Sequence, residues 1–244
     1  MWAMANLVIE IGNTALKAAW TEGKTLGKTF RYQGEKTLDF ILSITEKEKP
    51  EVMAVVSARP FTEAEEATLK GECSHLMLLD SAHPDYLQRY GIPEYLSYDR
   101  ACSIMAVRHL FKGKPCTIFD FGTTLTIDLV DADGLYRGGN ISPGCRTRFK
   151  SLNRYAKALP MVNTPARIPQ EGTSLESSIE SGVISGIMFE IEGYVRQLPG
   201  NVIVFTGGDA IYFAKQMKYS LFVMSNLVLA GLAIMTDDYV EKNI

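Results

Sequence analysis

One pattern occurs twice in this chain, as LVIEIGNT at residues 7–14 and as TIFDFGTT at residues 117–124. In each copy an apolar run leads into an acidic residue, and glycine and threonine follow two and four positions later. A second apolar run, a polar turn and a third apolar run come after each copy. This order predicts three strands joined by tight turns, once near the start of the chain and once near its middle. A repeated unit of this kind indicates an internal duplication.

The remainder of each half alternates between helical and extended patterns. In the first half we expect helices at 38–44 and 62–70 and strands at 52–56 and 76–79. In the second half we expect helices at 148–159, at 176–198 and from 227, with strands at 202–205 and 221–223. A strand meander followed by this alternation, in duplicate, predicts an α/β fold of two similar domains with a cleft between them. We place the domains at 1–110 and 111–244, joined through a helix at 99–111.

The composition is that of an ordinary globular protein. Of 244 residues, 46% are hydrophobic and 22% are charged, and the formal net charge is -3. A surface that binds nucleic acid normally carries an excess of Lys and Arg, so this balance argues against a nucleic-acid partner. The four cysteines form no C-x-x-C pair and the three histidines have no metal-ligand spacing, so we expect free thiols.

The sequence gives no sign of secretion or of a membrane span. Residues 1–5 lack the positive region and the apolar stretch of a signal peptide. The most apolar late run, 221–235, is shorter than a bilayer span and contains Ser225 and Asn226. We therefore expect a cytoplasmic protein that does not act on a membrane.

The two acidic-x-Gly-x-Thr turns have the chemistry of a phosphate grip. Glycine lacks a Cβ, so phosphate oxygens can approach the backbone amides closely. Asn13, Thr14, Thr123 and Thr124 add side-chain donors, and the acidic residue at each strand end can hold Mg²⁺, which prefers oxygen ligands. Two such turns that face each other would clamp the phosphates of a nucleotide. The chain has neither a Walker A motif nor G-x-G-x-x-G, which argues against P-loop and Rossmann proteins.

This set of motifs resembles type III pantothenate kinase, a branch of the acetate and sugar kinase, heat-shock ATPase and actin superfamily. The similarity extends over nearly the whole chain. It implies two duplicated ribonuclease H-like domains of the actin-like ATPase type, with an interdomain nucleotide cleft. The family motif D-x-G-N-T falls on residues 10–14 and G-x-D-R falls on residues 97–100. D-x-G-T-A/T-x-T falls on residues 120–126, G-G-x-I-x-P-G on residues 138–144, and the late glycine turn on residues 206–209.

The resemblance implies an enzyme that transfers the γ-phosphoryl group of ATP to pantothenate, the first step of coenzyme A biosynthesis. Asp99 would be the general base that accepts the proton of the substrate hydroxyl. Arg100 would bind the carboxylate of pantothenate, which a guanidinium can meet with two hydrogen bonds. Contacts with the substrate are implied for Tyr90, Ser97, Tyr98, Asp99, Arg100 and the position of Leu175.

The nucleotide and ion sites follow from the same resemblance. Contacts with ATP are implied at Glu10, Ile11, Gly12, Asn13, Thr14, Ala15, Leu16, Lys17, Thr123, Gly207 and Gly208. Glu10 would hold Mg²⁺, directly or through water, and Asp120 would bind a monovalent cation, either K⁺ or NH₄⁺. The resemblance also implies a homodimer with the substrate pocket near the subunit interface.

Three residues depart from the family pattern. Glu10 replaces an aspartate, which keeps the charge but lengthens the side chain by one methylene. Ser97 replaces the glycine of G-x-D-R. Leu175 stands where the family has a substrate-contacting threonine, although the neighbouring Ser174 could supply a hydroxyl. A misplacement of about 1 Å can cost ~100-fold in rate, so these changes bear on catalytic efficiency more than on fold.

Two other functions are compatible with the sequence. Another small-molecule kinase or ATPase of the same superfamily would account for Glu10 and Leu175. A non-catalytic ligand-binding protein, resembling the accessory transcription factors related to this family, would have no chemical need for Asp99 and Asp120. Asp99 also has a structural alternative, as the N-cap of a helix that begins at Arg100.

Overall fold

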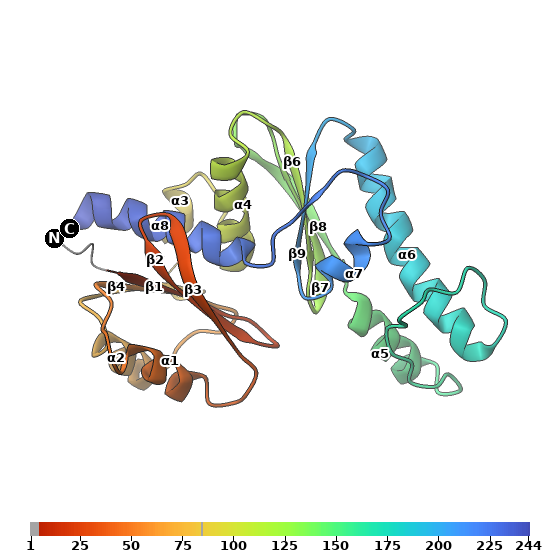
Figure 1. Cartoon of the computed structure of the whole chain (residues 1–244), viewed down its shortest axis with the longest axis horizontal. Coiled ribbons are helices and arrows are strands. Elements are labelled where there is room, and N and C mark those ends of the chain that lie inside the picture. Colours follow the sequence, from red (N-terminus) through yellow and green to blue (C-terminus); the bar gives the residue numbers. More distant parts are fainter. Residues whose placement is uncertain (1–4, 84) are drawn as a thin grey trace. The chain divides into compact units, whose positions relative to one another are not determined.

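The computed structural model describes residues 5–83 and 85–244, and these residues form two compact units. Unit 1 comprises Met1–Leu110 and Asn226–Ile244, and unit 2 comprises Phe111–Ser225 (Figure 1). Residues 1–4, on which the expectation of no signal peptide largely rests, lie outside the described residues. Within the described ranges, no helix combines the length and the apolar character that a membrane span requires.

Unit 1 is built on a five-stranded sheet in the order β3-β2-β1-β4-β5. β1, β2 and β3 form an antiparallel meander, and β4 and β5 extend the sheet in parallel with β1. The strands are β1 (Asn6–Ile11), β2 (Leu16–Glu22), β3 (Thr25–Tyr32), β4 (Val52–Ser57) and β5 (His75–Leu79). The helices are α1 (Thr37–Thr45), α2 (Glu63–Lys70), α3 (Asp85–Gln88), α4 (Tyr98–Leu110) and α8 (Leu227–Asn243).

Helices cover both faces of the unit 1 sheet, which explains why the interior strand β4 is apolar over residues 52–56. All six residues of β4 are buried. On one face, Ile41 of α1 and Leu69 of α2 share a core with Ile9 and Val55. On the other face, α4 and α8 contact β4, and α8 also contacts β1 (Figure 1). Strands buried on both faces lose the alternation of apolar and polar residues, and this signal correctly predicted β4.

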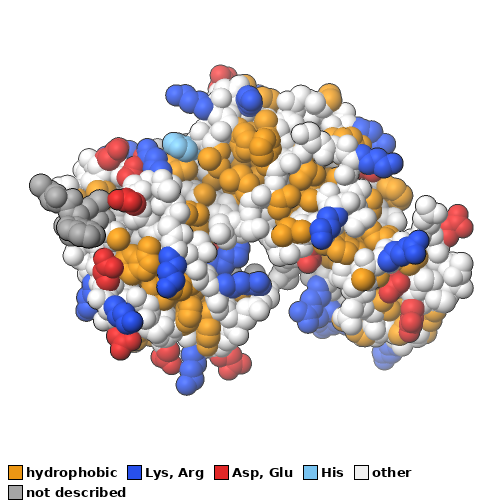
Figure 2. Space-filling model, viewed as in Figure 1, with side chains coloured by type: hydrophobic (Ala, Val, Ile, Leu, Met, Phe, Trp, Pro, Cys, Tyr) orange, Lys and Arg blue, Asp and Glu red, His pale blue; other side chains and the backbone are white. Residues whose placement is uncertain are grey.

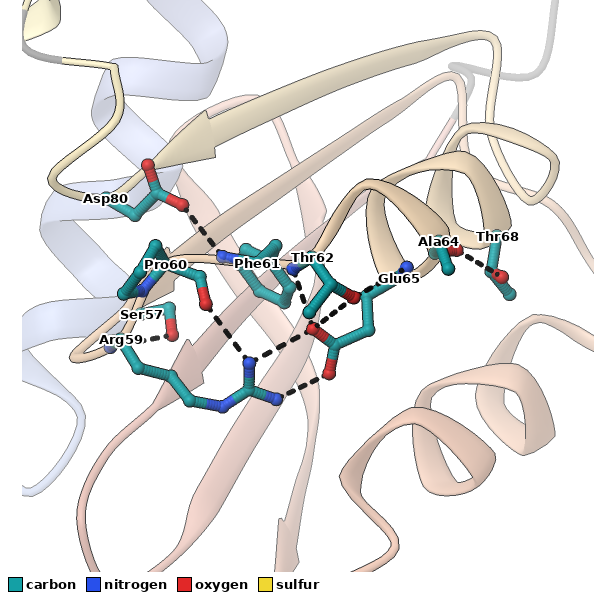
Figure 3. A network of polar contacts seen from close by, with 9 residues as sticks. All are labelled: Ser57, Arg59, Pro60, Phe61, Thr62, Ala64, Glu65, Thr68 and Asp80. Carbon is teal, nitrogen blue, oxygen red and sulfur yellow. Dashed lines mark hydrogen bonds and ion pairs between the residues drawn. The ribbon is translucent and has the colours of Figure 1, made fainter.

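The start of α2 illustrates how local chemistry sets an element boundary (Figure 3). Thr62 Oγ1 accepts from the Glu65 amide at 3.2 Å, and the Glu65 carboxylate accepts from the Thr62 amide at 2.9 Å. Arg59 lies 2.6 Å from the same carboxylate and, with these donors, holds the pKa of Glu65 at about 2. This capping box satisfies amides that would otherwise lack partners, and α2 begins where the sequence predicted it.

Unit 2 repeats the architecture with the order β10-β9-β6-β7-β8, so each strand has its counterpart in unit 1 and the predicted duplication is confirmed. Its core is rich in aromatic rings, with Phe119, Phe205 and Phe213 fully buried. The strands are β6 (Cys116–Phe121), β7 (Thr124–Val130), β8 (Tyr136–Pro143), β9 (Val202–Gly207) and β10 (Phe222–Val223). The helices are α5 (Cys145–Tyr155), α6 (Leu175–Gln197) and α7 (Ala210–Ala214).

The C-terminal helix departs from the division made on the sequence. The boundaries 1–110 and 111–244 assigned it to the second domain, but α8 packs on α4 and on the sheet of unit 1. α8 approaches α4 so closely at Gly231 that a Cβ there would lie 1.7 Å from the carbonyl oxygen of Cys102. The sequence division placed α8 in the second domain because α8 follows that domain in the chain. The apolar residues of a helix do not show which core the helix will join.

Candidate functional site

The first candidate phosphate grip is the turn that joins β1 to β2. The Gly12 amide donates to the Ala15 carbonyl oxygen at 3.1 Å and closes the turn. Gly12, Asn13 and Thr14 are exposed, whereas Leu16, at the start of β2, is buried. The backbone and side chains of residues 12–14 are therefore accessible to a phosphate-bearing ligand.

Glu10 and Lys17 face each other across the two strands that flank this turn. They pair in the β1–β2 register, and Lys17 Nζ lies 3.4 Å from Glu10 Oε2. The Glu10 side chain is 17% exposed, and its burial raises the pKa of the carboxyl group. Lys17 lowers that pKa, and the charge of Asp99 raises it further. The carboxylates of Glu10 and Asp99, from β1 and α4, therefore lie close enough to interact.

The donor set at Glu10 fits Mg²⁺ bound together with a nucleotide. Proteins commonly hold this ion through one or two carboxylates, with phosphates and water completing the octahedron. Glu10 supplies one such carboxylate next to the open turn at residues 12–14. Among residues 5–83 and 85–244, no group of three or more His, Cys, Asp or Glu side chains could hold a metal ion. A magnesium ion here would depend on phosphate oxygens.

Glu10→Gln is expected to raise thermal stability while lowering activity. Burial puts the folded-state pKa of Glu10 above the ordinary value of 4.5, so ionisation of this carboxyl group costs folding free energy. The folded wild type therefore loses stability, relative to the variant, as the pH rises from about 4 to about 8. Thermal melts should show a higher melting temperature for the variant at the higher pH and no difference at the lower pH.

The kcat/KM of Glu10→Gln for ATP with Mg²⁺ should fall about tenfold. A variant less stable than wild type at the higher pH would contradict the expectation, since the Lys17 ion pair would then outweigh burial.

The predicted G-x-D-R residues lie at the start of α4. Ser97 and Asp99 are exposed, and Tyr98 and Arg100 are buried. The Asp99 carboxylate accepts from the Arg100 amide at 2.9 Å and is open to solvent, where a substrate hydroxyl can reach it. The Tyr98 hydroxyl donates to the His83 carbonyl oxygen, and its predicted contact with substrate stays a prediction.

Asp99 is not the N-cap that was its structural alternative. α4 begins at Tyr98, and the Ser97 carbonyl oxygen accepts from the Ala101 amide at 3.0 Å. Asp99 thus lies within the first turn, where a carboxylate interacts favourably with the helix dipole. Ser97, a residue type as common at helix N-caps as Asp, precedes the helix instead.

Tyr90 lies in the segment between α3 and α4. The Tyr90 amide donates to the Leu87 carbonyl oxygen at 3.1 Å, and the chain then turns at Gly91 with φ of +60°, which glycine adopts without strain. The phenol is half-buried, and burial, followed by the charge of Asp238, raises its pKa to about 12. It is therefore neutral near pH 7 and able to donate a hydrogen bond to a substrate oxygen.

The second candidate grip joins β6 to β7 and is braced by α5. The Gly122 amide donates to the Thr124 carbonyl oxygen at 3.0 Å. The Thr123 carbonyl oxygen accepts from the Gly144 amide at 3.0 Å and from the Thr147 hydroxyl at 2.6 Å. A Cβ on Gly144 would lie 2.2 Å from the Gly122 carbonyl oxygen, so this approach requires glycine. The sequence drew no attention to Thr147, because a threonine within a helical pattern gives no sign of what it contacts.

Gly207 meets Asp120 at the carboxyl ends of β9 and β6. Its φ is +91°, and a Cβ there would lie 2.4 Å from Asp120 Oδ1 and 2.6 Å from the Phe121 carbonyl oxygen. The Phe121 amide nitrogen is also 2.6 Å from that position, so this close approach requires glycine and brings the Asp120 carboxylate beside the turn. A carboxylate is a ligand that fits a hard cation. The next residue, Gly208, is exposed, and burial raises the pKa of Asp209 after it.

Leu175 is the first residue of α6 and is 54% exposed. The neighbouring hydroxyl of Ser174 was the expected substitute for the missing threonine. That oxygen instead caps α6, accepting from the Ser177 amide at 3.2 Å and lying 2.9 Å from the Ser177 hydroxyl. The expectation that Ser174 compensates for Leu175 is therefore not supported.

The predicted site residues fall into two groups, each contained within one unit. Unit 1 holds residues 10–17, Tyr90 and residues 97–100, and unit 2 holds Asp120, Thr123, Leu175 and residues 207–208. Each unit thus presents a glycine turn with an acidic residue at the end of the preceding strand. Each unit therefore carries its own candidate phosphate grip.

The sequence matches a known protein family over most of its length. The family model described as type III pantothenate kinase matches residues 6–197. A type III pantothenate kinase from Bacteroides fragilis is 34% identical over 232 residues, which covers 93% of this chain and 95% of that protein. The similarity therefore includes both units.

Similar solved structures show the fold of this chain. A Baf family transcriptional activator from Campylobacter jejuni has a TM-score of 0.65 at 20% identity, covering 96% of this chain and 99% of that chain. An activator of 2-hydroxyisocaproyl-CoA dehydratase from Clostridium difficile, solved with bound ADPNP, has a TM-score of 0.58 at 13% identity, covering 98% and 96%. These likenesses confirm the predicted two-domain, actin-like ATPase fold and nothing further. With a family model matching most of its length, the chain belongs to the type III pantothenate kinase family.

Proposed function

We propose that this chain phosphorylates pantothenate with ATP, giving 4′-phosphopantothenate and ADP for coenzyme A biosynthesis. The observation that carries the proposal is the family match combined with an exposed carboxylate, Asp99, at the start of α4. In this reaction the primary hydroxyl oxygen of pantothenate bonds to the γ-phosphorus, and the bond from phosphorus to the bridging oxygen breaks. The electron pair of that bond stays with ADP, and Asp99 takes the hydroxyl proton.

We assign the phosphates of ATP to the two glycine turns. The first offers the amides of Asn13 and Thr14 with their side chains, and the second offers Thr123. Phosphoryl transfer passes through a loose transition state with charge spread over the phosphoryl oxygens, so catalysis depends on donors held in position. The hydrogen bonds that fix the Thr123 carbonyl serve this purpose, because they hold the turn before ATP arrives. Gly207 lets the turn pack against Asp120, and the exposed Gly208 leaves room for the nucleoside.

Two ions complete the proposed nucleotide site. Mg²⁺ bound with ATP neutralises charge on the phosphates, and Glu10 is the residue that would hold it, directly or through water. Asp120 and the Phe121 carbonyl would hold a monovalent cation, K⁺ or NH₄⁺. The assignment is supported by the place of Asp120 at the end of β6, beside the Gly207 turn, and by the preference of hard cations for oxygen ligands.

For pantothenate we assign Arg100 and Tyr90, with Ser97 beside the reacting hydroxyl. A guanidinium can meet the substrate carboxylate with two hydrogen bonds, and the neutral phenol can donate one more. Tyr98 would contribute through its backbone, since its hydroxyl holds the His83 carbonyl. The exposed Leu175 would offer an apolar contact where the family has a hydroxyl.

We further propose a cytoplasmic homodimer that requires neither nucleic acid nor membrane. On the face in Figure 2, Lys and Arg side chains are interspersed with Asp and Glu among the described residues. Unit 2 exposes Ile141 of β8 (62%) and Phe189 of α6 (66%). Arg148 of α5 ties these two elements together through Ser142 and Glu190, so the apolar side chains lie on linked elements suited to a second copy.

ADP release measured with and without pantothenate tests the function. We expect release that depends on pantothenate and rises at least about 100-fold when the substrate is added, as expected where a bound alcohol must position the attack. Release that is independent of pantothenate would favour another kinase or ATPase activity, for which Glu10 and the missing hydroxyl at Leu175 are the supports. Ligand binding without turnover would favour the non-catalytic alternative. The likeness to the Baf family activator does not support that alternative, since it concerns the fold alone.

A further inference from the structure

The segment that carries Tyr90 is tied to α4 at two points. The Tyr98 hydroxyl, in the first turn of α4, donates to the His83 carbonyl. Arg108, near the end of the helix, donates from Nη1 to the Tyr90 carbonyl at 2.8 Å. Ten residues separate Tyr98 from Arg108, which is about 15 Å along a helix. The segment therefore follows α4 over most of its length.

Buried apolar side chains hold the same segment independently of these polar contacts. Leu87, Ile92 and Leu96 are 1%, 3% and 2% exposed. Tyr90 lies between the first two, where the chain turns at Gly91. The peptide group between Tyr90 and Gly91 is held on its amide side, where Gly91 donates to the Gln88 carbonyl oxygen at 3.0 Å. Arg108 holds the carbonyl side of the same peptide group and joins it to α4.

We propose that Arg108 is a positioning residue, which orients Tyr90 by holding its carbonyl against α4. This inference rests on the proposed role of Tyr90 in binding pantothenate. An arginine suits the task because its guanidinium is rigid and charged at every relevant pH, so the hydrogen bond is strong and directional. Its Nη1 also lies 3.6 Å from Met105 Sδ, and the side chain is half-buried, which limits its freedom.

α4 carries both the proposed base, Asp99, and the arginine that holds Tyr90. Asp99 lies in the first turn of α4, and Tyr90 is fixed to the same helix by Arg108. The Tyr90 phenol is also within electrostatic reach of Cys102 on α4 and of Asp238 on α8. α4 thus sets the spacing between the group that accepts the proton and a group that holds the substrate. A change at Arg108 should alter binding of pantothenate and leave the nucleotide unaffected.

Arg108→Met tests the inference by steady-state kinetics with each substrate varied. We expect the KM for pantothenate to rise about tenfold, with the KM for ATP and kcat changing less than about twofold. Arg108→Lys, which keeps one donor, should give a smaller rise and provides a second variant if the methionine protein folds poorly. Arg154→Met is the matched control, because exposed Arg154 belongs to unit 2 and its guanidinium lies over the Tyr155 ring, 5.7 Å from the centroid. It removes the same charge and should leave both KM values unchanged.

A double-mutant cycle with Tyr90→Ala separates the inference from the function on which it rests. If Arg108 acts through Tyr90, Arg108→Met should add less than about twofold to the KM for pantothenate in the Tyr90→Ala background. A full effect in that background, or an equal rise in both KM values, would overturn the inference. So would a large effect of Tyr90→Ala with none from Arg108→Met. No effect of Tyr90→Ala would remove the proposed role of Tyr90 and this inference with it. Release of ADP that depends on pantothenate would still support the proposed reaction.

Discussion

Replacing Asp99 with asparagine should lower kcat about 10²- to 10⁴-fold, the range that a positioned general base contributes. Asparagine has the size of aspartate, and its carbonyl oxygen can still accept from the Arg100 amide, 2.9 Å away in the wild type. It cannot take the proton of the substrate hydroxyl. Because this interaction is made in the transition state, kcat and kcat/KM for pantothenate should fall together. The KM for ATP should stay within about threefold.

Asp39→Asn is the matched control for this experiment. Asp39 is an exposed aspartate in the first turn of α1, so it shares the secondary-structure position and the unit of Asp99. Each substitution removes one favourable interaction with a helix dipole, about 0.3–1 kcal/mol. Thermal melts should therefore shift by similar small amounts, and only Asp99→Asn should change turnover. A variant that keeps more than about a tenth of the wild-type kcat would exclude Asp99 as the base.

The duplicated fold could be predicted because its signals are local. β4 is recognisable from five residues, 52–56, since a strand buried on both faces is apolar throughout. The turns after β1 and β6 are recognisable because glycine and threonine directly follow an acidic strand end. Each feature depends on neighbours in sequence, so one chain without relatives was sufficient to place the two candidate phosphate grips.

The remaining features depend on contacts between distant residues. Thr147 braces the turn at Thr123 across 24 positions, and nothing in its surroundings distinguishes it from other helical threonines. The Tyr98 hydroxyl donates to the His83 carbonyl oxygen, 15 positions away. The assignment of α8 to unit 1 follows from its packing on the sheet and on α4, where Gly231 meets Cys102, more than a hundred residues earlier. Such contacts were beyond prediction because an apolar or hydroxyl side chain fits many partners equally well.

Gly231→Ala should strongly destabilise the protein, although alanine is ordinarily the better helix former. The added Cβ would lie 1.7 Å from the Cys102 carbonyl oxygen, 2.4 Å from its carbon and 2.9 Å from its Cα. These are backbone atoms of α4, so no side-chain rotation can relieve the overlap, and α4 must move away from α8. Both helices are buried here, and Cys102 Sγ lies 3.9 Å from Met235 Sδ on the next turn of α8. We expect a loss of about 3 kcal/mol, which lowers Tm by roughly 6–12 °C for a chain of this length.

Gly193→Ala provides the control with the opposite sign. Gly193 also lies within a helix, α6, but a Cβ there meets nothing within 4 Å. Helix propensity alone then acts, and the free energy of unfolding of the variant should rise by up to about 1 kcal/mol.

Asp99 lies on α4 one turn before Cys102, so the displacement in Gly231→Ala should also lower kcat about tenfold or more at temperatures where the protein is folded. Equal melting temperatures for the two alanine variants would mean that α8 does not pack against α4 as described. If Gly231→Ala were folded at low temperature and fully active, the placement of Asp99 would not depend on the contact between Gly231 and Cys102.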